Sequence, residues 1–320
     1  MGTVPPRRNR ASALPGPADA PFFTSTGPRS YLAPSPLHSA VAMKRSRIAG
    51  LILIATVVVA GGVLWSRQPS NDRDWEIGQE RMPLAEFGEA RVTIRNVRNF
   101  RYDADGRPLP AYEDRVYDLD LIESVWLIIA PFERDNRGPA HSFLSFGFAD
   151  SQYVAISIEA RRESDEQYSL LKGLLRQFEM LYVIGDEHDL IGLRANHRGD
   201  DVYVYPIRTS PAKVRQLFAE MLESANQLTR QPAFYNTLLN NCTTRILDHA
   251  NHVTDRKIRW GREVLLPGYA DQLAMRLGLL DATGTMEEVR ARFLINERAR
   301  QFADAPDFST RIRAAPGRRP

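Results

Sequence analysis

The sequence has only one cysteine, Cys242, among its 320 residues. A disulfide within the chain is therefore excluded. The sequence also lacks a glycine-rich phosphate loop and a Gly-x-Ser-x-Gly nucleophile elbow, which argues against P-loop nucleotide binding and against an α/β-hydrolase serine enzyme. Histidine is scarce as well, with six residues, so each one can be considered as a possible acid, base or metal ligand.

Long apolar runs are equally scarce, since the only uncharged one covers residues 48–65. Its length is at the short end of the roughly 18 to 20 residues that a transmembrane helix needs. No small-x-small cleavage site follows it, which favours a membrane anchor over a cleaved signal peptide. Residues 1–47 are rich in arginine and contain one acid, Asp19, so the positive-inside rule keeps this end in the cytoplasm.

Charge and composition divide the chain into segments. Residues 1–47 account for more than the whole net charge of +3, so the remainder is slightly acidic and no nucleic-acid partner is expected. The predicted organisation is a disordered basic cytoplasmic tail at 1–47, a transmembrane helix at 48–65, a linker at 66–90, a periplasmic domain at 91–260 and a helical extension with a basic tail at 261–320.

The hydrophobic pattern changes from strand-like to helix-like near Ser210. Strands are predicted at residues 90–102, with a break near Asn96, and at 124–132, 141–148, 152–162, 178–184, 190–195 and 201–208. Helices are predicted at residues 211–228, 242–253, 269–280 and 286–302, with Ser210 and Thr285 as N-caps. Strands followed by helices indicate the α+β class, here an antiparallel sheet with helices packed on one side.

The hairpin formed by residues 141–148 and 152–162 places ionisable side chains together. A turn centred on Asp150 sets His141 opposite Glu159, and both side chains then project from the same face. That face also carries Ser145, Tyr153 and Ser157, whereas the other face carries the apolar residues Leu144, Phe146, Phe148, Val154, Ile156 and Ile158. The hairpin therefore has one core face and one small, polar face.

Cys242 follows two asparagines, Asn240 and Asn241, either of which can cap the helix that begins there. In the first helical turn, free backbone N–H groups and the helix dipole favour a thiolate over a thiol. An imidazolium at His141 would favour it further. A nucleophilic thiol, a histidine base and a carboxylate that orients the histidine are the elements of covalent acyl chemistry. The alternative role for Cys242 is a buried core residue.

Two other histidines, His249 and His252, are three residues apart and could bind a metal on one helix face. No third ligand is evident from the sequence, so we expect no metal and no cofactor.

Several motifs in order resemble the Lnb N-terminal periplasmic domain family. They are "NDRDW" at Asn71, "NVRNFRY" at Asn96, "YDLDLIESVWL" at Tyr117, "HSFLSFGF" at His141, "SIEARRE" at Ser157, "YVIGDEHDLIGLR" at Tyr182, "VYVYPI" at Val202 and "FYNTLLNNCTT" at Phe234. The resemblance implies a cysteine nucleophile at Cys242, a histidine at His141 and a lipoprotein N-acyltransferase-like activity. The order of His, carboxylate and Asn-Cys is also similar to permuted papain-like thiol enzymes of the lecithin retinol acyltransferase and NlpC type.

We therefore expect a single-pass protein of the bacterial inner membrane whose periplasmic domain transfers acyl groups through Cys242. His141 is the expected acid–base residue and Glu159 orients it. The side chains expected to bind substrate are Asn241, Ser145, Tyr153, Ser157 and Arg161, with Asn241 a candidate oxyanion donor. The expected partners are a lipid or acylated-protein substrate and the inner membrane. A cysteine peptidase or amidase, a lipid hydrolase and a non-catalytic envelope scaffold are the alternatives.

Overall fold

A computed structural model describes residues 36–103, 105–133, 136–255 and 257–313. The chain divides into two units, residues 1–61 and 62–320. In the first, the helix α1 (Pro36–Ser66) begins inside the segment that was expected to be disordered. Residues 1–35 of that segment and residues 314–320 of the basic tail lie outside the described residues. Within the described residues, no helix combines the length and the apolarity that crossing a membrane requires, so the span predicted at 48–65 finds no support.

The second unit is built on an eight-stranded sheet in the order β1-β2-β9-β8-β7-β6-β10, with β5 also paired to β2. Its strands are β1 (Leu84–Phe87), β2 (Arg91–Arg98), β5 (Tyr112–Asp118), β6 (Ile122–Pro131), β7 (Ala140–Phe148), β8 (Tyr153–Arg161), β9 (Glu179–Gly185) and β10 (Tyr203–Pro206). The short strands β3 (Arg101–Tyr102) and β4 (Pro108–Leu109) form a separate pair. The sheet is mixed rather than purely antiparallel, because β2 and β9 run parallel where Arg98 faces Gly185.

Helical segments follow and interrupt the strands. They are α2 (Leu170–Leu174), α3 (Glu187–Gly192), the π-helix η1 (Leu193–Arg198), α4 (Pro211–Arg230), α5 (Cys242–Val253), α6 (Arg262–Leu265), the 3-10 turn η2 (Pro267–Tyr269), α7 (Ala270–Arg276), α8 (Met286–Phe293), α9 (Asn296–Gln301) and α10 (Phe308–Arg311). The N-caps predicted at Ser210 and Thr285 are confirmed for α4 and α8. The α+β class is thus confirmed.

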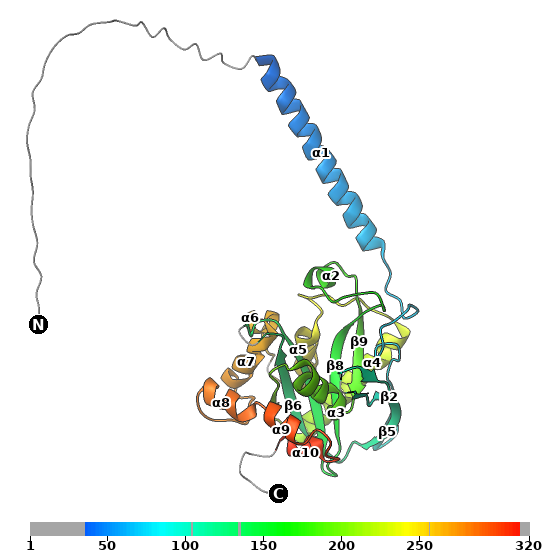
Figure 1. The fold of residues 1–320 in the computed structure, drawn as a ribbon, viewed down its shortest axis with the longest axis vertical. Helices are drawn as coiled ribbons and strands as arrows, with labels where there is room; N and C mark the ends of the chain where they lie inside the picture. The colour runs from blue at the N-terminus through cyan, green and yellow to red at the C-terminus, as the bar shows by residue number, and fades with distance from the viewer. Residues whose placement is uncertain (1–35, 104, 134–135, 256, 314–320) are drawn as a thin grey trace, which may run out of the picture. The chain divides into compact units, whose positions relative to one another are not determined.

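Helices cover both faces of the sheet, not one face as predicted (Figure 1). On one face, α4, α5 and α7 pack on a large core that contains Leu144, Phe146 and Ile156. On the other face, α3, η1, α9 and α10 pack on a smaller core around Phe143 and Ala155. Strand β7 is buried along its whole length because it lies between these two layers. The face with His141 is therefore covered at one end and open at the other.

The structure differs from two further predictions, one for a linker and one for a strand. The predicted linker at 66–90 is part of the folded unit, because it contains β1 and because the Asn71 side chain donates to the Leu228 carbonyl at 2.8 Å. The predicted strand at 190–195 is helical. Asp186 caps α3 by accepting a hydrogen bond from the His188 N–H, and η1 continues directly from α3. This helical segment carries Arg194 into the neighbourhood of the hairpin.

Candidate active site

Cys242 is the first residue of α5 and is 5 % exposed. The Asn241 side chain caps this helix by accepting from the Thr244 N–H at 2.9 Å, and the Thr244 hydroxyl oxygen accepts from the Asn241 backbone N–H at 2.8 Å. No acidic residue lies in the first turn. The predicted cap is confirmed at Asn241, and it leaves the backbone N–H of Cys242 without an intrahelical partner.

The sulfur lies beside two hydroxyl groups. Ser142 Oγ donates toward Cys242 Sγ at 3.8 Å, Thr243 Oγ1 is also 3.8 Å from the sulfur, and the two hydroxyls are 2.7 Å apart. Ser142 comes from β7, so the strand that carries the histidine also contacts the thiol. This contact fixes the position of the α5 N-terminus relative to His141.

The register of the hairpin is as predicted, with Leu144 opposite Ile156 and Gly147 opposite Tyr153. His141 and Glu159 lie on one face, but a serine stands between them. His141 Nε2 is 2.7 Å from Ser157 Oγ, Ser157 Oγ donates to Glu159 Oε1 at 2.9 Å, and Nε2 is 3.7 Å from that oxygen. The carboxylate therefore acts on the imidazole through Ser157.

This chain of hydrogen bonds determines the histidine tautomer. The single hydroxyl proton of Ser157 goes to Glu159, so Ser157 Oγ can only accept from His141, and Nε2 carries the proton. Nδ1 then keeps its lone pair. No hydrogen-bond partner of Nδ1 occurs among the residues that the structure describes. His141 is consequently arranged to accept a proton at Nδ1.

Both ionisable groups of the pair are strongly perturbed. Burial, together with the positive charge of Arg194, lowers the pKa of His141 to about 3 despite the nearby Glu159. Burial opposes ionisation of Glu159, but the adjoining His141, the guanidiniums of Arg98 and Arg194 and the Ser157 hydroxyl bring its pKa down to about 2. At neutral pH the resting site thus has a neutral histidine and an ionised glutamate. The imidazolium predicted to stabilise a thiolate is absent.

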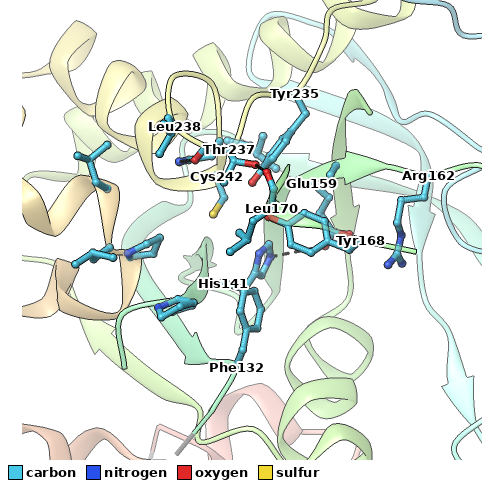
Figure 2. A pocket seen from close by; sticks show the side chains of 18 of the residues that line it. Phe132, His141, Glu159, Arg162, Tyr168, Leu170, Tyr235, Thr237, Leu238 and Cys242 are labelled. Atoms are coloured by element: carbon cyan, nitrogen blue, oxygen red, sulfur yellow. Dashed lines mark hydrogen bonds and ion pairs between the residues drawn. The ribbon is translucent and has the colours of Figure 1, made fainter. Parts of the chain in front are cut away.

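Cys242 and His141 line the same pocket (Figure 2). No hydrogen bond joins them in this structure, although catalytic hydrogen bonds often form only when substrate is bound. The mouth of the pocket is apolar and open. Its exposed leucines and phenylalanine are between 41 % and 55 % accessible, and they are Phe132, Leu170, Leu238, Leu265 and Leu266.

The structure brings only some of the predicted binding residues to this pocket. Asn241 lines it, but both ends of its amide are used, because Nδ2 donates to the Thr237 carbonyl at 2.6 Å. Ser157 acts on His141 as described above. Ser145, Tyr153 and Arg161 do not line the pocket.

These last three have structural partners instead. Ser145 donates to the buried Glu187, which also binds Arg313, and the Arg313 guanidinium lies over the Tyr153 ring at 4.1 Å. Arg161 donates to backbone carbonyls of the segment before β1, including that of Gln79 at 2.8 Å, and lies over the Trp75 ring.

Other residues of the pocket were not predicted. The phenols of Tyr168 and Tyr235 line it, and burial raises the pKa of each, so both are O–H donors at neutral pH. Arg194 of η1 also lines it and is 7 % exposed. The tyrosines lie in loops, where hydrophobic periodicity gives no signal, and Arg194 was assigned to a strand.

A possible metal site lies outside this pocket, on the far part of α5. Ligand atoms of His249, His252 and Glu220 all lie within 4.8 Å of one another, and Glu220 is the third ligand that the sequence did not reveal. The same atoms form ordinary hydrogen bonds, with His249 Nδ1 3.1 Å from Glu220 Oε1 and His249 Nε2 2.6 Å from the Tyr182 hydroxyl. These contacts satisfy the group without an ion.

Comparison with known protein families gives one match. The model of the Lnb N-terminal periplasmic domain matches residues 109–268. The chain belongs to the Lnb N-terminal periplasmic domain family. The matched part of this family domain contains His141, Glu159, Arg194 and Cys242, so the whole candidate site lies in a periplasmic domain. No curated protein and no solved structure matches the chain.

Proposed function

We propose that this periplasmic domain is a thiol acyltransferase that forms an acyl-Cys242 intermediate, with a lipid as acyl donor and an amine of a lipoprotein as acceptor. The observation that carries the proposal is the arrangement of one pocket. It combines a cysteine at a helix N-terminus with a neutral histidine whose tautomer is set by Ser157 and Glu159. We also propose that the domain is related to the permuted papain-like thiol enzymes.

In the first half-reaction the thiol loses its proton to His141 Nδ1, and the sulfur attacks the ester carbonyl carbon of the lipid. The C–S bond forms, the ester C–O bond breaks, and the imidazolium returns the proton to the departing alkoxide oxygen. Glu159, ionised at neutral pH, stabilises the transient imidazolium through Ser157. In the second half-reaction an amine attacks the thioester carbon, the C–S bond breaks, and the amine proton passes through His141 to the sulfur.

The developing oxyanion needs hydrogen-bond donors. The Cys242 backbone N–H is free of intrahelical bonds, and the phenol hydroxyls of Tyr168 and Tyr235 line the same pocket. The Asn241 amide, expected from the sequence to serve here, is committed to Thr244 and Thr237. We therefore assign the oxyanion site to the backbone N–H and one tyrosine.

The apolar mouth supports a lipid over a peptide as donor. Leucines from α2, from the loop before α5 and from the C-terminal end of α6 remain exposed around the entrance, as does Phe132. Contiguous exposed apolar surface at a pocket marks a binding surface for an apolar partner. A peptidase site would instead offer polar groups for a peptide backbone.

The test is the intact mass of the purified protein after incubation with phospholipid vesicles. We expect a mass gain equal to one acyl chain, lost on treatment with neutral hydroxylamine and absent from Cys242→Ala. Addition of an amine-bearing acceptor peptide should discharge the acyl group onto that amine. Discharge only to free fatty acid would indicate a lipid hydrolase. No adduct on wild type, with Cys242 inert to iodoacetamide, would leave the scaffold alternative.

A further inference from the structure

A second, polar pocket adjoins the thiol pocket and shares a wall with it. Five residues line both pockets, namely Gln79, Glu159, Arg162, Arg194 and Arg198. The shared wall thus has three guanidiniums and one carboxylate. The positive charges outnumber the negative one, and an excess of positive charge in a pocket attracts an anionic ligand.

The arginines of this region differ in how well their charges are paired. Arg98, in the polar pocket, binds Asp189 with Nε–Oδ2 at 2.8 Å, and Arg162 pairs with Glu76. Arg198 is exposed and has no carboxylate within ion-pair distance among the described residues. Within the described residues, Arg198 therefore keeps a positive charge that no carboxylate pairs with directly.

Arg194 is the most deeply buried of the three arginines in the shared wall. Its Nη1 atom is buried and forms no hydrogen bond within the described part of the chain, and its nearest carboxylate oxygen, Asp200 Oδ2, is 3.7 Å away. Burial lowers the pKa of Arg194 to about 10, so the side chain still carries its charge at neutral pH. A buried guanidinium with an unsatisfied N–H is destabilising unless an anion completes it.

The local backbone explains how both arginines reach the wall. Arg194 and Arg198 lie in the π-helix η1, which ends at Gly199 with φ 71°. π-Helical turns are rare and occur frequently at functional sites. The wider turn presents the guanidiniums of Arg194 and Arg198 to the same two pockets. Arg194 is close enough to Cys242 that a thiolate there would raise the Arg194 pKa.

We infer that Arg194 and Arg198 form an anion subsite that binds the phosphate of a lipid whose acyl ester lies at Cys242. This inference rests on the proposed acyl transfer and specifies its donor as a glycerophospholipid rather than a neutral diacylglycerol. The acyl chains lie over the apolar mouth, and the headgroup phosphate takes the N–H groups of Arg194 in the geometry that a guanidinium offers to phosphate.

A different role for Arg194 is possible in principle, because its charge also helps to keep Glu159 ionised. Arg194 would then be a positioning residue for the His141 relay, without contact to substrate. Two thiol reagents that alkylate by the same reaction but differ in charge distinguish the two roles. Iodoacetate and iodoacetamide form such a pair.

We compare the alkylation rates of Cys242 by the two reagents, each divided by the rate in the urea-unfolded chain. In wild type the anionic reagent should be favoured about tenfold, as expected for one charge-assisted hydrogen bond of roughly 1.5 kcal/mol. Arg194→Gln and the exposed Arg198→Gln should each reduce this preference, whereas Arg162→Gln, already paired with Glu76, should not. Equal slowing of both reagents in Arg194→Gln would overturn the subsite and assign Arg194 to Glu159.

A binding measurement keeps the subsite testable if the thiol is inert. Titration calorimetry of Cys242→Ala with dihexanoyl phosphatidate should show at least tenfold tighter binding than with dihexanoylglycerol, and Arg198→Gln should lose most of the difference. Equal affinity for the two lipids would overturn the inference whatever the activity. Inorganic phosphate or a free peptide carboxylate binding as tightly as phosphatidate would also overturn it, because the lipid would then add nothing.

Discussion

At the residue scale, the relay from Glu159 through Ser157 to His141 determines which nitrogen can act as base. Ser157→Ala should lower the alkylation rate of folded Cys242 by iodoacetamide about tenfold, because the loss of one hydrogen bond of about 1.4 kcal/mol frees the imidazole to change tautomer. Ser145→Ala is the matched control, since it removes another buried hydroxyl that does not line the pocket. Equal rates in both variants would exclude the relay.

The low pKa of His141 also has a consequence for stability. Its pKa falls from 6.5 in the unfolded chain to about 3 in the fold, so the unfolded state binds the extra proton between these values. Stability is therefore complete above pH 6.5 and falls as the pH drops toward 3.

Between pH 7 and pH 5, wild type should lose about 2 kcal/mol more of its unfolding free energy than His141→Gln does. Urea denaturation at the two pH values measures this, and the comparison cancels the contribution of His249, whose pKa burial also lowers. Parallel pH dependence in the two proteins would mean that His141 binds a proton in the fold as readily as in the unfolded chain.

The sequence predicts only some of the residues of this site. The symmetric turn of the hairpin placed His141 opposite Glu159, because strand register follows from side-chain alternation. Ser157, which lies between them, was predicted on the same face. Side-chain alternation does not show, however, that its hydroxyl hydrogen-bonds to both His141 and Glu159. Arg194 was missed because a short apolar segment with one charge does not distinguish a strand from a turn of helix.

At the element scale, α5 depends on the cap formed by Asn241. Asn241→Ala should lower the free energy of unfolding by about 1 kcal/mol, and Asn241→Ser should recover most of it, because the serine hydroxyl can still accept from the Thr244 N–H. The alkylation rate of Cys242 should follow the same order. If Asn241→Ala alters stability without altering the thiol, the helix N-terminus has no part in its reactivity.

Elements with strong local signals were predicted well. α4 and α8 begin at the expected caps, and β2 breaks near Asn96, where φ is 58° and the register with β5 shifts. The segment after β9 was predicted wrongly. Asp186, the N-cap of α3, is the sequence signal for a helix there, but the apolar residues that follow are equally suited to a strand.

At the scale of the whole molecule, the second core explains why the folded unit continues beyond residue 260. The side chains of Ile295, Phe308 and Ile312 belong to the same cluster as Phe143 of β7. A one-sided sheet was expected because the odd-numbered face of the hairpin looked polar. That face carries the candidate active site at one end, and residues far along the chain cover the remainder.

The C-terminal segment is held to the sheet by a buried ion pair. Arg313 binds Glu187 through Nη1–Oε2 at 2.7 Å, Glu187 is fully buried, and Ser145 of β7 donates to the same carboxylate. Two residues earlier, Arg311 forms only an exposed pair with Asp307. The two arginines therefore provide a matched comparison within one segment.

Arg313→Met should lower the free energy of unfolding by about 3 to 5 kcal/mol, because it leaves Glu187 buried without a counterion. Arg311→Met should change it by less than about 1 kcal/mol. The double variant Arg313→Met with Glu187→Gln should recover much of the loss, since the uncompensated charge is gone. Urea denaturation followed by tryptophan fluorescence reports on the region directly, because the Arg313 guanidinium lies 4.8 Å from the Trp126 ring centre. If the two single variants are equally stable, the C-terminal segment is not part of the cooperative fold, and residues 91–260 would suffice as the domain.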